Sequence, residues 1–145
     1  MKTANQKRMT TNITATKRAH SPYQPTGQWI TTVKRLAIYL RDGFKCFYCN
    51  KDLHNAKHNG ISLDHVIGRA ECHRKGLLTE MNKESNLVTA CDNCNYSRAG
   101  TSIAKFMRRM NNRLSTSTRL KKRLAVDLTS YLVNAKQILA KKQNR

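Results

Sequence analysis

Two pairs of cysteines in this chain have the spacing of metal ligands. Cys46 and Cys49 form the first pair, Cys91 and Cys94 form the second, and each pair encloses two residues. A Cys-x2-Cys pair can place two thiolates about one tetrahedral ion, so two pairs complete a closed four-thiolate zinc site. A redox-active pair and a disulfide are the alternatives, but the surrounding sequence lacks a thioredoxin-like βαβ context. We therefore predict one structural zinc ion.

The segment between the two pairs contains 41 residues. A minimal zinc ribbon separates its pairs by about 15–20 residues, so further elements must be built inside this longer segment. The segment also contains the fifth cysteine, Cys72, which is followed by His73. These two residues suggest a second metal site, but no other ligand stands at a suitable spacing. A free thiol in a loop is the favoured interpretation of Cys72.

Several polar residues near the cysteines are suited to phosphate chemistry. Asp64 and His65 are adjacent in "LDHVIG", Asn86 follows 21 residues after His65, and Asn95 comes directly after the last cysteine. Taken singly, each has an ordinary explanation, because most Asp-His dipeptides are surface pairs and a lone Asn often caps a turn. Their order relative to the two cysteine pairs is the informative feature.

In this order the motif Cys-x2-Cys, Asp-His, Asn-Leu-x3-Cys-x2-Cys-Asn-x2-Arg resembles the HNH endonucleases, over roughly residues 33–106. The resemblance implies the ββα-metal nuclease fold in its zinc-stapled form. The family usually has His at the last motif position, where this chain has Asn95, so the chain is similar to the HNN subset of phage and intron-encoded nucleases. An Asn still offers a carbonyl oxygen to a hard cation. Because Asn95 directly follows a cysteine, the zinc site would place it.

The resemblance implies a role for each residue of the motif. His65 is expected to be the general base, a task that suits an imidazole that is neutral near pH 7. Asp64 and Asn95 are expected to hold one catalytic Mg²⁺ or Mn²⁺ through hard oxygen ligands. Asn86 is expected to hold the hairpin loop and so aim His65, and Arg98 to contact a phosphate. On an ideal strand Asp64 and His65 point to opposite faces, so both reach one site only if the strand ends or bulges there.

The charge of the chain points to a polyanionic partner. The 145 residues include 28 Lys and Arg but only 8 Asp and Glu, for a formal net charge of +20. Six of the eight carboxylates lie within residues 46–98, so the two ends of the chain are strongly basic. Nucleic acid is the commonest partner for such a balance, and an anionic membrane surface is the weaker alternative. We expect DNA to be contacted by a set of basic residues in the C-terminal part, namely Arg108, Arg109, Arg113, Arg119, Lys121, Lys122 and Arg123.

The sequence is expected to form an α+β protein of three segments. Residues 1–28 are polar and basic and are predicted to be a disordered arm. Residues 29–106 are expected to form the nuclease domain, a small ββα-metal core with structural zinc, preceded by a helix from Trp29 that ends at Asp42-Gly43. The segment "FKCFYCNKDL" is expected to be a strand that turns through the first cysteine pair. Residues 107–145 are expected to be a basic helical extension that binds DNA.

Two amphipathic helices are predicted near the C-terminus. In "SIAKFMRRMNNRL" the apolar stripe is formed by Ile103, Phe106, Met110 and Leu114. In residues 115–143 we expect one long helix, capped by Ser117 or Thr118, with a stripe that includes Leu120, Leu124, Leu128 and Leu132. These leucines are expected to face protein and to leave the basic residues near the phosphates. The alternative is that both helices only complete the core.

The combined expectation is a metal-dependent DNA endonuclease of phage or mobile-element type. The alternative is a non-catalytic, zinc-stapled module that binds nucleic acid, which would explain the charge and the cysteines but not the Asp-His pair or the two Asn residues. No apolar run approaches the roughly 20 residues that cross a bilayer, so no membrane partner is expected. The first residues lack the apolar core of a secretion signal, and we expect an intracellular protein.

Overall fold

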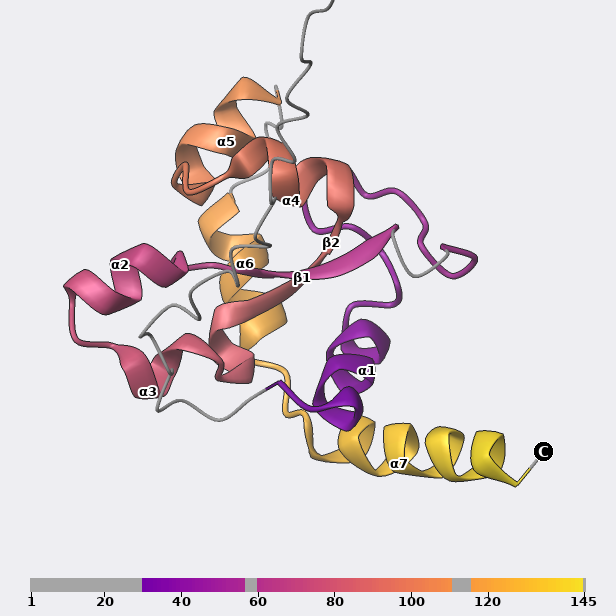
Figure 1. Cartoon of the computed structure of the whole chain (residues 1–145). Helices are drawn as coiled ribbons and strands as arrows, with labels where there is room; N and C mark the ends of the chain where they lie inside the picture. Colours follow the sequence, from indigo (N-terminus) through magenta and orange to yellow (C-terminus); the bar gives the residue numbers. More distant parts are fainter. Residues whose placement is uncertain (1–29, 57–59, 111–115, 145) are drawn as a thin grey trace, which may run out of the picture.

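The computed structural model describes residues 30–56, 60–110 and 116–144, which combine helices with a small sheet in the expected α+β class. The predicted arm at 1–28, together with Trp29, Arg113 and Leu114, lies outside the described residues. Figure 1 shows the sheet at the centre and helices around it. In chain order the elements are α1 (Thr32–Arg41), β1 (Ile61–His65), α2 (Arg69–Arg74), α3 (Leu78–Met81), the 3-10 turn η1 (Glu84–Asn86), β2 (Leu87–Cys91), α4 (Asp92–Arg98), α5 (Ile103–Arg109), α6 (Thr116–Leu124) and α7 (Thr129–Gln143).

The sheet is a single antiparallel pair, β1 with β2. Ile61 pairs with Cys91 at one end and His65 with Leu87 at the other. Helices α2 and α3 fill the connection between the strands, and α4 starts at the residue that follows β2. The segment around the first cysteine pair was predicted to be a strand, but it forms only an isolated bridge between Lys45 and Asp52. The chain turns too tightly there to extend the ladder.

Helix α1 ends where the sequence predicts, and its last residues support the sheet. The helix stops at Arg41, and Gly43 takes a positive φ of 60° that glycine adopts at little cost. The Asp42 carboxylate accepts a hydrogen bond from the Thr89 N–H at 2.7 Å and from Arg41 Nε at 2.7 Å. The Thr89 carbonyl accepts from the Phe47 N–H at 2.9 Å. The outer edge of β2 is therefore paired with other parts of the same chain, which blunts a site of edge-to-edge association.

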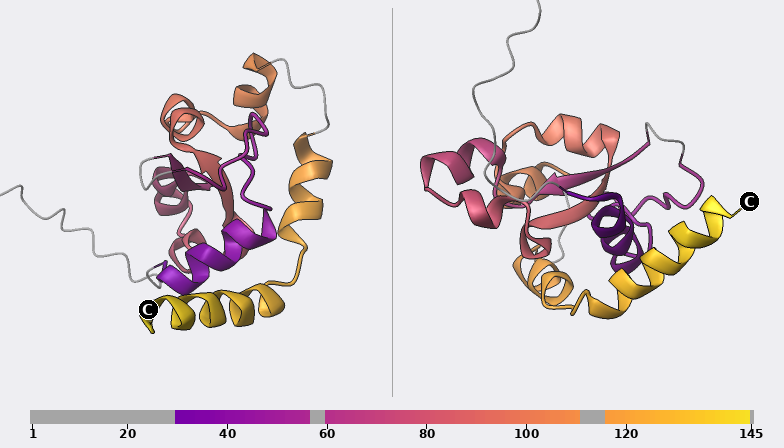
Figure 2. Two further views of the ribbon diagram at one scale, coloured as in Figure 1. Left: turned by 90° about the vertical axis from the view of Figure 1, so that its right-hand side faces the viewer. Right: turned by 60° about the horizontal axis from the view of Figure 1, so that its bottom comes forward.

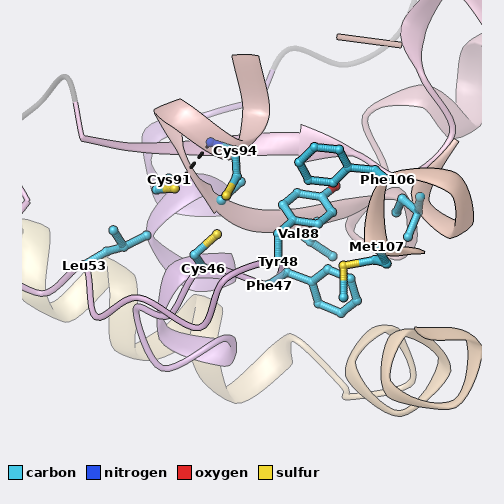
Figure 3. Close-up of a cluster of buried hydrophobic side chains, with 11 residues drawn as sticks. Cys46, Phe47, Tyr48, Leu53, Val88, Cys91, Cys94, Phe106 and Met107 are labelled. Carbon is cyan, nitrogen blue, oxygen red and sulfur yellow. Dashed lines mark hydrogen bonds between the residues drawn. The ribbon is translucent and has the colours of Figure 1, made fainter. Parts of the chain in front are cut away.

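Strand β2 is buried along its whole length and separates two hydrophobic clusters. Val88 and Ala90 belong to the first cluster, which surrounds the cysteines, and Leu87 belongs to the second. Alternate residues of a strand face opposite sides, so the single strand supplies both clusters. Figure 3 shows the first cluster, in which the Tyr48, Phe47, Phe106 and Met107 side chains gather beside the cysteine sulfurs.

The C-terminal helices share these clusters with the rest of the chain. Leu120 and Leu124 of α6 pack against the first cluster, and Leu128 and Leu132 pack in the second, as the leucine stripe predicted. Figures 1 and 2 show α7 running beside α1. The expected boundary between residues 106 and 107 falls inside α5. Helices α6 and α7, which belong to the expected C-terminal extension, therefore also supply core residues.

Two details of these helices differ from the prediction. The expected long helix is interrupted between α6 and α7, because the Asp127 carboxylate accepts from the Thr129 N–H at 3.1 Å and from the Thr129 hydroxyl at 2.8 Å, a local pairing that starts α7 anew. Ser117 and Thr118 lie inside α6 and so do not precede it as caps. In α5 the buried stripe includes Met107, whereas Met110 is exposed beyond the helix end.

We expect Leu128→Ala to lower the free energy of unfolding by about 2–4 kcal/mol, because it opens a cavity between α1 and α7. Leu128 is 5% exposed and lies within the second cluster. Val133 on α7 is 52% exposed, so Val133→Ala is the matched control, with an expected change within about 0.5 kcal/mol. Urea denaturation of both variants measures the difference. Equal losses would mean that α7 contributes little to the core.

Among the described residues, no helix combines the length and the apolar character needed to cross a bilayer.

Candidate functional site

The four paired cysteines converge on one point. The sulfur atoms of Cys46, Cys49, Cys91 and Cys94 all lie within 4.8 Å of one another, and the Cys49 and Cys91 sulfurs are 3.9 Å apart. A tetrahedral zinc with bonds of about 2.3 Å to sulfur separates its ligands by about 3.8 Å, so the spacing fits such an ion. Figure 3 shows the sulfurs of the three buried members facing one another. These four side chains could hold a metal ion such as zinc.

The second cysteine pair also forms the start of α4. Cys91 is the N-cap, and its sulfur accepts a hydrogen bond from the Cys94 N–H at 3.4 Å. Burial raises the pKa of Cys46 to about 11 and also raises the pKa of Cys94. Without a metal these thiols therefore stay protonated near pH 7, and an ion that bound them would displace protons.

Cys72 differs from its predicted setting as a loop thiol. It lies within α2, is fully buried, and its sulfur is 3.5 Å from the Ile67 carbonyl oxygen. Among the described residues, Cys72 and His73 belong to no cluster of three or more metal-ligating side chains. Cys72 is thus a packing residue of the α2 segment.

Four residues of the sequence motif line a single pocket of about 560 Å³. They are Asp64, His65, Asn95 and Arg98. The pocket lies where β1 ends, with walls from α2 and α4. Two adjacent residues of a strand can reach one site only if the strand ends or bulges there. Strand β1 ends at His65, and both Asp64 and His65 line the pocket. Asn86 belongs to the same motif but is not among the residues that line the pocket.

Arg98 is not a free cation at the pocket surface. Its Nη1 lies 2.7 Å from each oxygen of the Asp64 carboxylate and donates to the His65 carbonyl at 2.9 Å, while Nη2 donates to the Val66 carbonyl at 2.9 Å. The side chain is 4% exposed. Because α4 is docked against β1, a charge at this position is buried and needs a partner. Arg98 thus forms a buried ion pair that orients Asp64, and its expected contact with a phosphate stays a prediction.

Tyr48 is a second partner of Asp64, and the sequence did not single it out. Its hydroxyl donates to Asp64 Oδ2, and its ring packs edge-on against Phe106 with centroids 5.2 Å apart. Burial and the nearby carboxylate raise the pKa of Tyr48, so the phenol remains a donor. Tyr48 stands between the two cysteines of the first pair. The Tyr48–Asp64 hydrogen bond thus connects the first cysteine pair with the pocket.

His65 contacts a side-chain amide through its ring. Its Nε2 lies 2.9 Å from Asn82 Oδ1, and because an amide oxygen accepts, this contact favours the tautomer with the proton on Nε2 and the lone pair on Nδ1. Burial lowers the pKa of His65, which favours the neutral ring. Asn82 follows α3 and has no motif around it that would have revealed the contact.

Asn86 holds the loop after β1, as expected. Its Oδ1 accepts from the Ile67 N–H at 2.7 Å, and its Nδ2 donates to the carbonyls of Ile67 at 3.2 Å and Met81 at 3.0 Å. These bonds fix the backbone two residues beyond His65. Asn86 therefore holds the loop that follows His65, whereas Asn82 contacts the His65 ring itself.

Asn95 is oriented by its amide nitrogen. Nδ2 donates to the Ser62 hydroxyl at 3.0 Å and to the Leu63 carbonyl at 3.4 Å. Its Oδ1 accepts no hydrogen bond from the described residues, so this oxygen is available to a cation. Asp64 accepts three hydrogen bonds of the roughly four that a carboxylate can take, which leaves one position. Carboxylate and amide oxygens of this kind are the ligands that hard cations prefer.

The six predicted DNA-binding residues that the structure describes fall into two groups. Arg108, Arg109, Lys121 and Lys122 are exposed. Arg119 and Arg123 instead lie over the Phe47 ring, with guanidinium carbons 4.7 and 5.6 Å from its centroid, and Arg119 also donates to the Phe47 carbonyl. Residues four apart lie on the same face of a helix. Arg119 and Arg123 therefore both face Phe47, on the side of α6 that packs against the rest of the chain. DNA contact by the exposed group stays a prediction.

Comparison of this chain with family models, with curated proteins and with solved structures finds no match.

Proposed function

We propose that this chain is a metal-dependent DNA endonuclease of the HNH type. The observation that carries the proposal is that Asp64, His65 and Asn95 line one pocket. The chain order β1, β2, α4 supports it, because the resemblance implies a ββα arrangement. The four-cysteine cluster would hold a structural zinc that fixes the start of α4. The phage or mobile-element type follows from the resemblance, and the intracellular setting from the composition of the first residues; both remain part of the proposal.

In this mechanism His65 is the general base. Its Nδ1 takes a proton from water, and the water oxygen attacks phosphorus. The bond from phosphorus to the 3′-oxygen then breaks, and the leaving oxygen takes a proton from solvent water, which gives a 5′-phosphate and a 3′-hydroxyl. Asp64 and Asn95 would hold Mg²⁺ or Mn²⁺, which stabilises charge on the phosphate and on the leaving oxygen. Arg98 and Tyr48 keep the Asp64 carboxylate in place.

The second candidate is a zinc-stapled module that binds nucleic acid without cutting it. The excess of basic residues and the cysteine cluster favour it as much as they favour a nuclease. A module that only binds nucleic acid has no evident need for the His65 imidazole beside the side-chain oxygens of Asp64 and Asn95 in one pocket. The nuclease is therefore the better-supported function.

Incubation of the purified chain with supercoiled plasmid and Mg²⁺ or Mn²⁺ tests the proposal. Nicked or linear plasmid is expected with either ion. No cleavage is expected when EDTA removes the divalent ion. DNA binding without cleavage in either ion would favour the non-catalytic module.

Asn95→Ala should lower the cleavage rate at limiting Mg²⁺ and recover in part at high Mg²⁺ or Mn²⁺, because the variant lacks one ligand. Asn95→His should keep some activity and shift the preference toward Mn²⁺ or Ni²⁺, which imidazole suits better than Mg²⁺. Asn93 is exposed on the same helix, so Asn93→Ala is the matched control. Titration of the cleavage rate with each metal measures the effect. An Asn95→Ala curve that overlays the wild type would exclude Asn95 as a ligand.

A further inference from the structure

The pairing of charges around the pocket leaves an excess of positive charge. Its charged lining residues are Asp64, Arg69, Glu71, Arg74 and Arg98. Both carboxylates are neutralised at 2.7 Å, Asp64 by Arg98 and Glu71 by Lys75. The side chains of Arg69 and Arg74 form no hydrogen bond or ion pair with the other described residues. Lys75, and to a smaller extent the charge of Arg74, lowers the pKa of Glu71, but only Lys75 pairs with that carboxylate directly. The two charges of the lining without a direct partner are therefore both guanidinium groups.

Both arginines come from α2, the helix that follows β1 after a short loop. Figure 1 shows α2 continuing from the end of β1, the strand that carries Asp64 and His65. Arg69 and Arg74 are exposed, so their guanidinium groups are accessible to a ligand in the pocket. The loop that connects them to His65 is held by the Asn86 side chain, which fixes the start of α2 relative to the imidazole.

We propose that Arg69 and Arg74 form the subsite for the phosphodiester that is cleaved, the role that the sequence had suggested for Arg98. This inference rests on the proposed nuclease function. A guanidinium presents a planar set of donors that matches two phosphate oxygens, and such bonds are among the stronger hydrogen bonds of proteins. Phosphate oxygens gain negative charge in the transition state, so donors fixed around them stabilise it more than they stabilise bound substrate. Arg98 is already paired with Asp64 and with the carbonyls of His65 and Val66.

The matched variants are Arg69→Gln, Arg74→Gln and the control Lys136→Gln. Lys136 is exposed on α7, the helix that lies at the other end of the molecule from α2. Each arginine variant should lower the single-turnover rate at saturating plasmid by about 10²-fold, the usual effect of removing one transition-state donor. Arg69→Lys should recover part of the loss, because it keeps the charge but not the fork. The control should cut at the wild-type rate.

A binding measurement separates this inference from the nuclease proposal. Dithymidine monophosphate contains one phosphodiester and is too small to bridge the pocket and a remote basic surface. Titration of this dinucleotide into the wild type should shift the amide NMR signals of α2. A variant that combines Arg69→Gln with Arg74→Gln should lose these shifts. If the wild type cuts no DNA, the nuclease proposal fails, and the titration still decides the subsite. If the variants cut at the control rate, or bind the dinucleotide as the wild type does, the subsite is overturned.

Discussion

Protein purified without added metal is expected to contain about one zinc ion per chain and to unfold when a strong chelator removes it. Structural zinc sites supply about 10–16 kcal/mol at pH 7, which is comparable to the whole stability of a small domain. Here Cys46, Cys91 and Cys94 lie inside the first hydrophobic cluster, and Cys91 caps α4. Loss of the ion would therefore disrupt the core and the pocket together. Elemental analysis and circular dichroism during chelation measure both effects.

Cysteine substitutions give the same test without a chelator. Cys46→Ser should lower zinc content and abolish the cooperative unfolding transition, because it removes a buried ligand. Cys72 is equally buried but lies outside the cluster, so Cys72→Ser is the matched control and should retain one zinc ion. A chain that contained no metal and remained folded would refute the zinc assignment.

Replacement of His65 by alanine should reduce plasmid cleavage by about 10²–10⁴-fold, the contribution of a general base. Affinity for DNA should change little, because the base acts on the chemical step. The exposed His54 pairs with Asp52 at 2.8 Å and lies outside the pocket, so His54→Ala is the matched control. Single-turnover cleavage and DNA-binding isotherms of both variants provide the comparison.

The His65 variant must also keep its zinc and its melting transition for the comparison to hold. Under those conditions, cleavage by His65→Ala at the wild-type rate would exclude His65 as the base. Asn82→Ala should give an intermediate loss, because the imidazole remains but loses the contact that favours the tautomer with the proton on Nε2.

Residue types with a short list of uses could be predicted from the sequence. Four cysteines in two pairs have few functions in common, and the structure brings their sulfurs together. The same holds for the pocket, where the motif residues Asp64, His65 and Asn95 meet. The hydrophobic spacing that placed the leucines of the C-terminal helices against protein was also correct, because periodicity reports which face is buried.

Pairings across the fold were not predictable from local pattern. Arg98 looks like any basic residue of a basic chain, and its burial follows only from the docking of α4 on β1. Arg119 and Arg123 were expected near DNA, yet they lie on Phe47, a residue more than 70 positions away in the sequence. The break before α7 depends on Asp127, whose carboxylate competes with the helix for the same backbone group. In each case the partner was chosen by tertiary structure.

The hydrogen bond from Tyr48 to Asp64 links the orientation of Asp64 in the pocket to the folding of the first cysteine pair. Tyr48 is carried by the turn that the first cysteine pair closes, so its hydroxyl reaches the carboxylate only when that turn is formed. Under the proposed activity, a chain in which this turn is not closed would lack one of the two side chains, Tyr48 and Arg98, that orient Asp64. Zinc binding would then have to precede DNA cleavage, so the supply of zinc would control when the chain becomes an active nuclease.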